Sequence, residues 1–340
     1  MNARKAIIAV GMAVVVLAIA IGVGSVFVHP KDTLAILISR LPGQILPETI
    51  TELTASIVLK IRLPRVLMAF FVGASLSLSG TVMQAVLRNP LASSYTLGVA
   101  SGGALGAALV IVLGINFFGL FTLPIVGFVF GLSTVLFAMG LTRALDQSLE
   151  NNTIILVGIV FTQFVNALLT LVTAFSNEHL QQLIFWQMGS FAGNGYAQVL
   201  IVLGVLLVCL MVLSRYTWEM DLMSFGEEQA LSSGVDLKRV KMILIGMAVL
   251  ACGTAVAFTG TVGFVDLIAP HVMRRLFGPK HKLVLPFAAI SGGMFMVVAD
   301  LISRTVLAPR ELPVGAVTAL VGAPFFAYIY FSRRKKALEC

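Results

Sequence analysis

Long runs of apolar residues without a charge recur along this chain, and each is long enough to cross a lipid bilayer. Five of them lie at residues 6–28, 66–87, 151–177, 242–265 and 312–332. A further run, at residues 89–142, contains Gly114, Gly119 and Pro124, so it predicts two helices joined by a turn. Because about 20 residues at a rise of about 1.5 Å cover a hydrocarbon core of about 30 Å, each continuous run predicts a transmembrane helix.

The composition places these runs in lipid and favours helices over strands. Hydrophobic residues make up 59% of the 340 residues and charged residues only 11%, whereas soluble domains carry about 25% charged residues. Backbone groups in lipid must bond to one another, which leaves helices or a closed barrel, and barrel strands would alternate over about 10 residues. We predict an all-α, polytopic transmembrane helical bundle in which residues 1–340 form a single membrane domain.

The first run has an alternative interpretation as a cleaved signal peptide, because Arg4 and Lys5 precede it. The run is longer than the apolar core of a usual signal peptide, which has about 7–15 residues, and no small-residue cleavage site is obvious after it. We therefore interpret residues 6–28 as a retained first span.

Positive charges between the runs predict the topology. The net charge of +8 could suggest a nucleic-acid partner, but the Lys and Arg residues lie between the spans, which is typical of loops on the cytoplasmic side. The basic cluster at residues 333–336 places the C-terminus in the cytoplasm, and Arg4 with Lys5 places the N-terminus there too. The number of crossings is then even, and the assignment gives ten.

One crossing in this assignment is unusually short. If the basic stretches on either side both face the cytoplasm, the chain must leave and return between Lys241 and Arg274. Residues 242–260 form the outward helix, which leaves residues 261–273 for the return. An element this short and polar is tolerated at membrane depth when it is buried in protein or lines a cavity, so we expect it near the translocation path. Candidates for lining the path are Thr261, Val265, Asp266 and Ala269, together with Gln84 and Asn89, which could instead bond to neighbouring helices.

The cytoplasmic loop at residues 218–239 carries a helix of its own. Ser224 and Glu227 have the S-x-x-E spacing of a capping box, Glu227 and Glu228 favour a helix start, and Gly234 suits a helix end. One interpretation is a solvated connector. Connectors usually have about 2–6 residues, however, so a longer one with a capped helix favours a docking element.

Residues that carry chemistry are scarce in this sequence. It contains no nucleophile–base set, no metal-ligand spacing and no phosphate-binding G-x-x-x-x-G-K-[ST] loop. Cys209, Cys252 and Cys340 form no framework. We therefore expect no catalytic or metal site in this chain, and any driving energy must come from a partner or an ion gradient.

Several short motifs occur in a fixed order between residues 62 and 330. They are Arg62-Leu-Pro-Arg65, Arg88-Asn-Pro-Leu-Ala92, Gly226-Glu-Glu-Gln-Ala230, Gly260-Thr-Val-Gly-Phe264, Glu311-Leu-Pro-Val-Gly315 and Gly322-Ala-Pro324. Together they resemble the FecCD/BtuC-type permease family of ABC importers, whose members take up iron-siderophores, haem or cobalamin. The match is specific for the family and not for the substrate.

The resemblance implies a ten-span subunit that pairs with a second copy or a paralogue and works by alternating access. It also implies two cytoplasmic ABC ATPases that hold ATP and Mg²⁺, and an external substrate-binding protein. The chain would be no enzyme, would bind no cofactor or nucleic acid, and would lie in the bacterial cytoplasmic membrane. The expected cargo is an iron chelate such as a ferric siderophore, with haem and cobalamin as alternatives.

The resemblance also gives roles to residues. The coupling helix corresponds to the docking loop, with Ser224, Gly226, Glu227, Glu228, Gln229, Ala230 and Gly234. Arginines that meet the binding protein match Arg62, Arg65 and Arg304. Pro64 should hold Leu63 extended and begin a helix. Asp266 departs from the family, which usually has a small residue there, so its carboxylate could alter gating or pair with an arginine.

Other interpretations stay open for the charged residues. Arg62 and Arg65 could be anchors at the membrane interface, and Asp300 with Arg304, four residues apart, could be a structural ion pair. A secondary transporter or channel without an ATPase would need intramembrane carboxylates. Asp266 and Asp300 are the candidate carboxylates for such a transporter or channel. A protein of that class would leave the docking loop unexplained.

Overall fold

The computed structural model describes the chain except for residues 1, 25–27, 40–46, 48 and 339–340. Cys340 and the side chains of the basic cluster at 333–336 lie outside what is described. The first half of the chain forms α1 (Asn2–Gly22), α2 (Pro30–Ile38), α3 (Glu52–Ser56), the π-helical η1 (Ile57–Arg62), α4 (Leu63–Val86), the 3-10 turn η2 (Ser94–Leu97), α5 (Val99–Leu113), η3 (Gly119–Phe121) and α6 (Thr122–Leu145).

The second half is helical as well. It forms α7 (Asn151–Ala174), η4 (Asn177–His179), α8 (Leu180–Met188), α9 (Tyr196–Ser214), α10 (Thr217–Phe225), α11 (Glu227–Ser232), α12 (Leu237–Thr259), α13 (Val265–Phe277), α14 (His281–Thr305) and α15 (Val314–Leu338). Within the described residues no strand occurs. The predicted all-α fold is confirmed.

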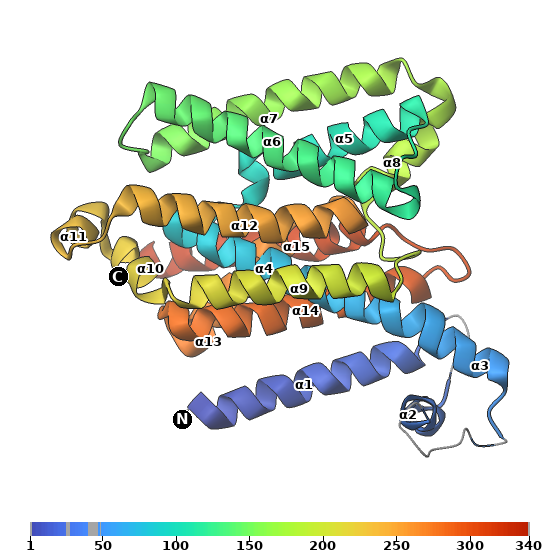
Figure 1. The fold of residues 1–340 in the computed structure, drawn as a ribbon. Coiled ribbons are helices and arrows are strands. Elements are labelled where there is room, and N and C mark those ends of the chain that lie inside the picture. Colours follow the sequence, from blue (N-terminus) through green and yellow to red (C-terminus); the bar gives the residue numbers. More distant parts are fainter. Residues whose placement is uncertain (1, 25–27, 40–46, 48, 339–340) are drawn as a thin grey trace.

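The helices that can cross a membrane match the predicted spans. Six are long and apolar enough, and three shorter apolar helices lie in α1, α5 and α15. With α13 at the place of the short return element, the described chain has a helix at each of the ten predicted crossings. Figure 1 shows the long helices running side by side, with α10, α11 and both chain ends at one end of the bundle and α2 and α3 at the other. We call these the α11 end and the α2 end.

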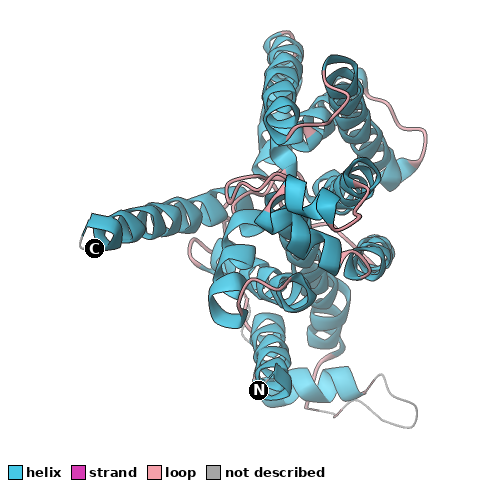
Figure 2. Ribbon diagram, turned by 90° about the vertical axis from the view of Figure 1, so that its left-hand side faces the viewer, coloured by secondary structure: helices cyan, strands magenta, loops and turns pink. Residues whose placement is uncertain are grey.

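Helix α4 forms the centre of the bundle, because small residues let its neighbours approach closely. From Val72 to Leu87 every residue is buried. A Cβ atom added to Gly73 would lie 2.3 Å from the carbonyl oxygen of Gly292 in α14, so the two backbones touch there, as is typical of glycine-rich membrane interfaces. By contrast, the helix that ends at the C-terminus, α15, stands out from the bundle in Figure 2.

The start of the second span differs from the prediction. Leu63 is helical, with φ −61° and ψ −49°, and residues 52–86 form one continuous helical stretch. The expectation of an extended Leu63 and a helix beginning at Pro64 was therefore wrong. A proline has no amide to donate and its ring crowds the preceding turn. The wider π-helical turn at Ile57–Arg62 accommodates both, so the helix continues through Pro64.

Candidate functional site

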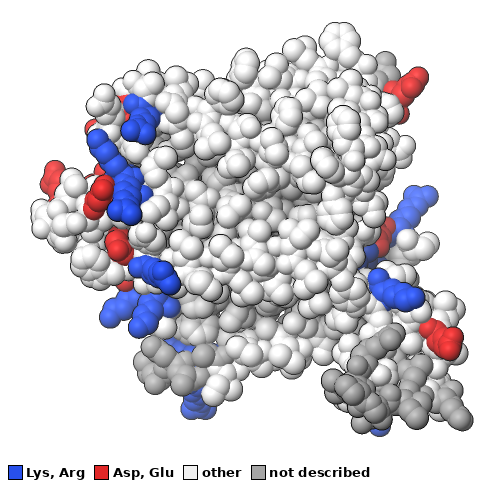
Figure 3. All heavy atoms as spheres, in the orientation of Figure 1, with Lys and Arg blue, Asp and Glu red and all other residues white. Residues whose placement is uncertain are grey.

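On the face drawn in Figure 3, the charged side chains lie at the two ends of the molecule. Figure 3 shows Lys, Arg, Asp and Glu side chains gathered at the α11 end and at the α2 end, with a broad uncharged band between them. Such a band is what a bilayer-spanning surface requires. Three sites follow from this arrangement: a helical unit at the α11 end, a groove along the bundle, and a buried ion-pair network at the α2 end.

The docking loop contains two short helices instead of one. Ser224 lies inside α10, where its hydroxyl donates to the Met220 carbonyl, and α11 begins after Gly226 without a side-chain cap. The predicted capping box of Ser224 and Glu227 was therefore wrong. Gly226 has φ +152°, which few other residues adopt, so it makes the sharp junction between α10 and α11.

The end of α11 matches the prediction. Gly234 has φ +83°, and its amide donates to the Leu231 carbonyl, while the amide of Val235 donates to the Ala230 carbonyl. These two hydrogen bonds form a Schellman motif, which satisfies the last carbonyls of the helix. Helix α11 is thus a compact, well-ended unit that projects from the bundle.

A buried lysine attaches α11 to the bundle. Lys241 in α12 is fully buried, and its Nζ donates to Glu227 Oε1 at 2.9 Å and to the Leu149 carbonyl at 2.7 Å. This cation therefore joins α11 and α12 to the loop between α6 and α7. From the positive-inside pattern alone, Lys241 is expected only as a loop charge. The spacing of Leu237, Lys241 and Leu244 is the signal for its burial, because it places the lysine on the buried stripe of α12.

The α6–α7 loop is ordered by one carboxylate. Asp146 accepts hydrogen bonds from the amides of Ser148 and Glu150 and from the Ser148 hydroxyl. The Ser148 hydroxyl is the leading cause that holds the pKa of the Asp146 carboxyl below its usual range. The loop therefore presents the Leu149 carbonyl to Lys241 in a fixed position.

Hydrogen bonds between Asp221 and His281 attach α10 to α14. Asp221 Oδ1 lies 2.7 Å from His281 Nδ1 and also accepts from the His281 amide at 2.8 Å. The carboxylate thereby satisfies a free amide at the start of α14. Because α13 leads directly into α14, movement of α10 and α11 would reach both the return element and α12.

The outer surface of α11 is exposed and mixed in character. A groove of 780 Å³ runs beside it, and its lining includes Arg88, Glu150, Asn152, Phe225, Glu228 and Gln229. Phe225 is 74% exposed and Leu231 is 57% exposed. Exposed aromatic and aliphatic side chains next to charges are typical of a surface that binds a protein partner.

The return element divides into a buried helix and a more open segment. Val265, Asp266 and Ala269 are buried, and one carboxylate oxygen of Asp266 accepts from the Ser93 hydroxyl while the other has no partner among the described residues. Asp266 thus pairs with no arginine in the part of the chain that the structure describes. The Gln84 amide donates to the Asp266 carbonyl and accepts from Arg274, so in this conformation Gln84 ties α4 to α13. Asn89 is half-buried, and its side chain accepts from the Leu91 amide.

Thr261 lines an open groove. The groove has a volume of 620 Å³ and lies between α5, α7, the end of α8, the segment after α12 and the start of α15. All of its lining side chains are neutral: Tyr95, Ala100, Ser101, Ala104, Thr162, Asn166, Leu169, Gln187, Met188, Thr261, Phe264, Ala316 and Ala319, with Gly263 and Gly315. The groove can therefore hold a large molecule that needs no charged partner.

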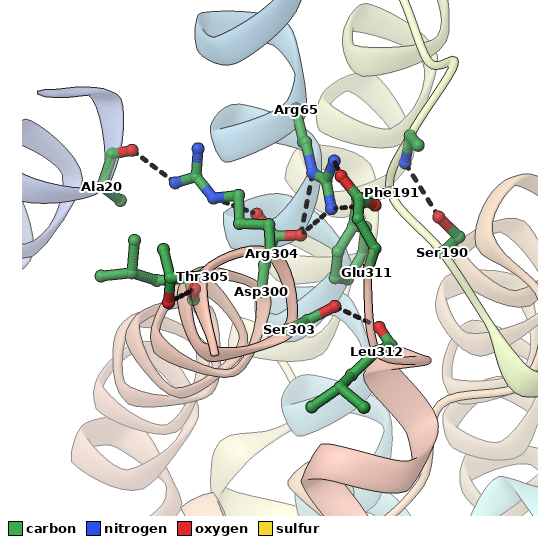
Figure 4. A network of polar contacts seen from close by, with 12 residues as sticks. Ala20, Arg65, Ser190, Phe191, Asp300, Ser303, Arg304, Thr305, Glu311 and Leu312 are labelled. Atoms are coloured by element: carbon green, nitrogen blue, oxygen red, sulfur yellow. Dashed lines mark hydrogen bonds and ion pairs between the residues drawn. The ribbon is translucent and has the colours of Figure 1, made fainter. Parts of the chain in front are cut away.

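The predicted docking arginines, Arg62, Arg65 and Arg304, are buried, and Figure 4 shows Arg65 and Arg304 on either side of Asp300. Arg65 lies 2.9 Å from Asp300 and bonds Glu311 through two nitrogens, at 2.7 and 3.0 Å. Arg304 lies 3.4 Å from Asp300 without hydrogen-bond geometry. The structural ion pair considered for Asp300 and Arg304 is therefore present, and Glu311 is a partner that sequence analysis missed.

Two of these arginines also donate hydrogen bonds to carbonyls at the C-terminal end of α1. Arg304 donates to the Ala20 carbonyl, and Arg62 donates to the carbonyls of Ile21 at 3.2 Å and Gly22 at 2.9 Å. These are among the last carbonyls of α1, which have no partner within the helix. Cations at a helix C-terminus also interact favourably with its dipole.

Known proteins are similar to this chain in sequence and in fold. The profile of the FecCD transport family matches residues 12–332. YvrB of Bacillus subtilis, an uncharacterised ABC transporter permease protein, is 38% identical over 282 residues, which cover 82% of this chain and 80% of YvrB. The cobalamin import system permease protein BtuC of Halobacterium salinarum is 37% identical over 297 residues, 85% of this chain and 77% of the relative. A structure described as an inward-facing conformation of a metal-chelate type ABC transporter superposes with a TM-score of 0.82 at 29% identity, covering 97% of this chain and 99% of that one.

Proposed function

This chain belongs to the FecCD transport family as the permease subunit of an ABC importer, and from that premise we propose that it carries an iron chelate across the cytoplasmic membrane by alternating access. Relatives are named for cobalamin, haem, Fe(3+)-citrate and molybdate import. Haem, cobalamin and molybdate are therefore the alternative cargoes that the relatives suggest.

The neutral groove is the observation that carries the substrate proposal. A bare metal cation or an oxyanion would need charged groups or several aligned donors along its path. A chelate shields its own metal and presents a large, mostly neutral surface. The groove beside Thr261 offers matching side chains: small apolar residues with a few neutral donors and acceptors such as Asn166 and Gln187.

The cargo is tested by uptake of radioactive iron, supplied as a ferric siderophore, into cells that carry the chain and its partner subunits. We expect uptake that excess of the same ferric chelate suppresses and that excess cobalamin or haem leaves unchanged. Suppression by cobalamin or haem would identify those as the cargo instead.

The two charged ends of the molecule are the places where partner proteins would bind. We propose that the α11 end faces the cytoplasm, together with both chain termini, and that α11 docks one of two ABC ATPases. A second permease copy or a paralogue would complete the path, and an external binding protein would dock at the α2 end. Arg65 is already paired with Glu311, whose side chain is 44% exposed. A carboxylate of the binding protein would therefore have to exchange with Glu311.

ATPase docking is tested at Glu228, which is exposed, whereas its neighbour Glu227 is bound to Lys241. Replacing Glu228 with lysine should reduce ATPase co-purification roughly tenfold, because a reversed charge in an interface is repelled by groups that complement the glutamate. The chain should still insert in the membrane. A matched control is Glu178→Lys, an exposed glutamate outside the α10–α11 unit. Undiminished co-purification and full uptake in the Glu228 variant would contradict docking through α11.

The path is tested with single cysteines. Thr261→Cys should react with a water-soluble thiol reagent, because Thr261 lines the groove, whereas Val265→Cys and Ala269→Cys should be protected in the conformation described here and become reactive in another transport state. Native Cys209 and Cys252 are buried, and Cys340 should be replaced by serine. Protection of all three positions in the apo, ATP-bound and vanadate-trapped complexes would show that this element does not line the path.

A further inference from the structure

A basic pocket lies where α6 ends and α12 begins, apart from the sites above. It has a volume of 390 Å³ and is lined by Arg143, Gln147, Leu149, Lys238, Arg239 and Met242. All three cationic side chains are exposed, and the only other lining groups are an amide and two apolar side chains. The pocket therefore concentrates positive charge at one point on the α11 end.

The cations of this pocket are not neutralised by ion pairs. Among the described residues, none of the ion pairs involves Arg143, Lys238 or Arg239. The nearest carboxylates along the chain are engaged elsewhere: Asp146 accepts from its own loop, and Asp236 accepts from the Arg239 amide as the N-cap of α12. The guanidinium and ammonium groups remain available to an anion.

Exposed apolar side chains continue from the pocket along the bundle. Met242 is 45% exposed and follows Lys238 by four residues, so the two share one face of α12. On α6, Leu136 is 61% exposed and precedes Arg143 by seven residues, or two helical turns, so it lies on the same face. A ligand in the pocket would thus meet cations at its head and apolar surface beside it.

We propose that this pocket binds the phosphate headgroup of an anionic phospholipid, whose acyl chains lie against Leu136 and Met242. Basic pockets between transmembrane helices on the cytoplasmic side are suited to such headgroups. The lining favours a lipid over the partner ATPase, because this pocket and the groove beside α11 share no residue. The α6–α7 loop separates them: Gln147 and Leu149 line the lipid pocket, whereas Ser148 and Glu150 line the other groove. The proposal does not depend on the cargo.

The test is lipid retention by the full-length chain, purified with its co-purifying subunits and measured by native mass spectrometry. The probes are phosphatidylglycerol, phosphatidylethanolamine and, as a soluble headgroup, glycerol phosphate. We expect the unmodified chain to retain phosphatidylglycerol in preference to phosphatidylethanolamine. The triple variant Arg143→Gln, Lys238→Gln, Arg239→Gln should lose that preference roughly tenfold, because each basic residue near a membrane surface contributes to anionic lipid binding.

A matched control removes three exposed cations from the other basic loop at the same end. The variant Arg275→Gln, Lys280→Gln, Lys282→Gln should keep its phosphatidylglycerol. The charge-preserving variant Arg143→Lys, Lys238→Arg, Arg239→Lys should keep it too. If the triple pocket variant fails to fold, the single variant Arg143→Gln, compared with Arg275→Gln, gives the same comparison with a smaller loss.

Four results would overturn the proposal. They are unchanged lipid retention in the pocket variant, equal loss in the pocket and control variants, displacement of the lipid by glycerol phosphate, and loss of the ATPase with the lipid retained. The last result would assign the pocket to a protein partner. The second would mean that retention follows total charge, and the third that the headgroup alone is recognised.

Discussion

Replacing Asp300 with asparagine should destabilise the chain by about 3 kcal/mol, because it leaves two buried guanidinium groups without their shared carboxylate. Breaking a buried ion pair by removing one partner costs about 3–5 kcal/mol. The lower end applies here, since Arg65 keeps Glu311 and Arg304 keeps the Ala20 carbonyl. The measurement is thermal stability of the purified chain in detergent, together with its yield from membranes.

The matched control for this prediction is Glu311→Gln. Glu311 bonds the same arginine, but its side chain is 44% exposed whereas that of Asp300 is 1% exposed. Exposed ion pairs contribute within about 1 kcal/mol, so this variant should remain close to the unmodified chain. Equal losses in the two variants would show that burial does not set the strength of this network.

Replacing Lys241 with methionine should uncouple ATP hydrolysis from transport. Methionine fills much of the same apolar space but removes the bonds to Glu227 and Leu149, so α11 would lose its attachment to α12 and to the α6–α7 loop. We expect the ATPase to remain bound and to hydrolyse ATP, while the cargo transported per ATP falls roughly tenfold. Loss of the donor to the buried Leu149 carbonyl should also lower stability by about 1–3 kcal/mol.

The measurement is the ratio of uptake to ATP hydrolysis in proteoliposomes. Lys282→Met, an exposed lysine at the same end, controls for the loss of one charge. Glu227→Gln should reproduce the effect, and the double variant should be no worse than Lys241→Met, because both single changes break the same bond. A ratio equal to that of the unmodified chain would show that Lys241 has only a structural role.

Much of this fold could be predicted because the bilayer imposes a simple rule. Continuous uncharged runs predicted the long helices, and the Lys and Arg residues between the runs predicted the short return element at α13. Rules for local caps were less successful. Ser224 and Glu227 have the spacing of a capping box, but α10 continues through Ser224 because Gly226 provides the junction.

The site was harder to predict than the fold, because its contacts join distant residues. Asp300 and Arg304 are four residues apart, so their pairing could be anticipated from helix geometry. Arg65 and Glu311 are separated by 246 positions, and no spacing rule connects them. The same holds for Lys241 and Leu149, whose bond depends on how the α6–α7 loop folds over α12.

The two ends of α1 are held very differently. At the α2 end its last carbonyls are bonded by the buried Arg62 and Arg304. At the α11 end the first turns of α1 contact the bundle through the exposed bond from Lys5 to the Leu276 carbonyl at 3.2 Å, through the same ammonium 5.3 Å from the Phe277 ring centre, and through Ala9, which packs beside Met273 and Phe287. A helix that is held firmly at one end and weakly at the other rotates about the firmly held end. During transport, α1 should therefore behave as a pivoting arm, with its largest displacement near Lys5 and almost none near Ala20.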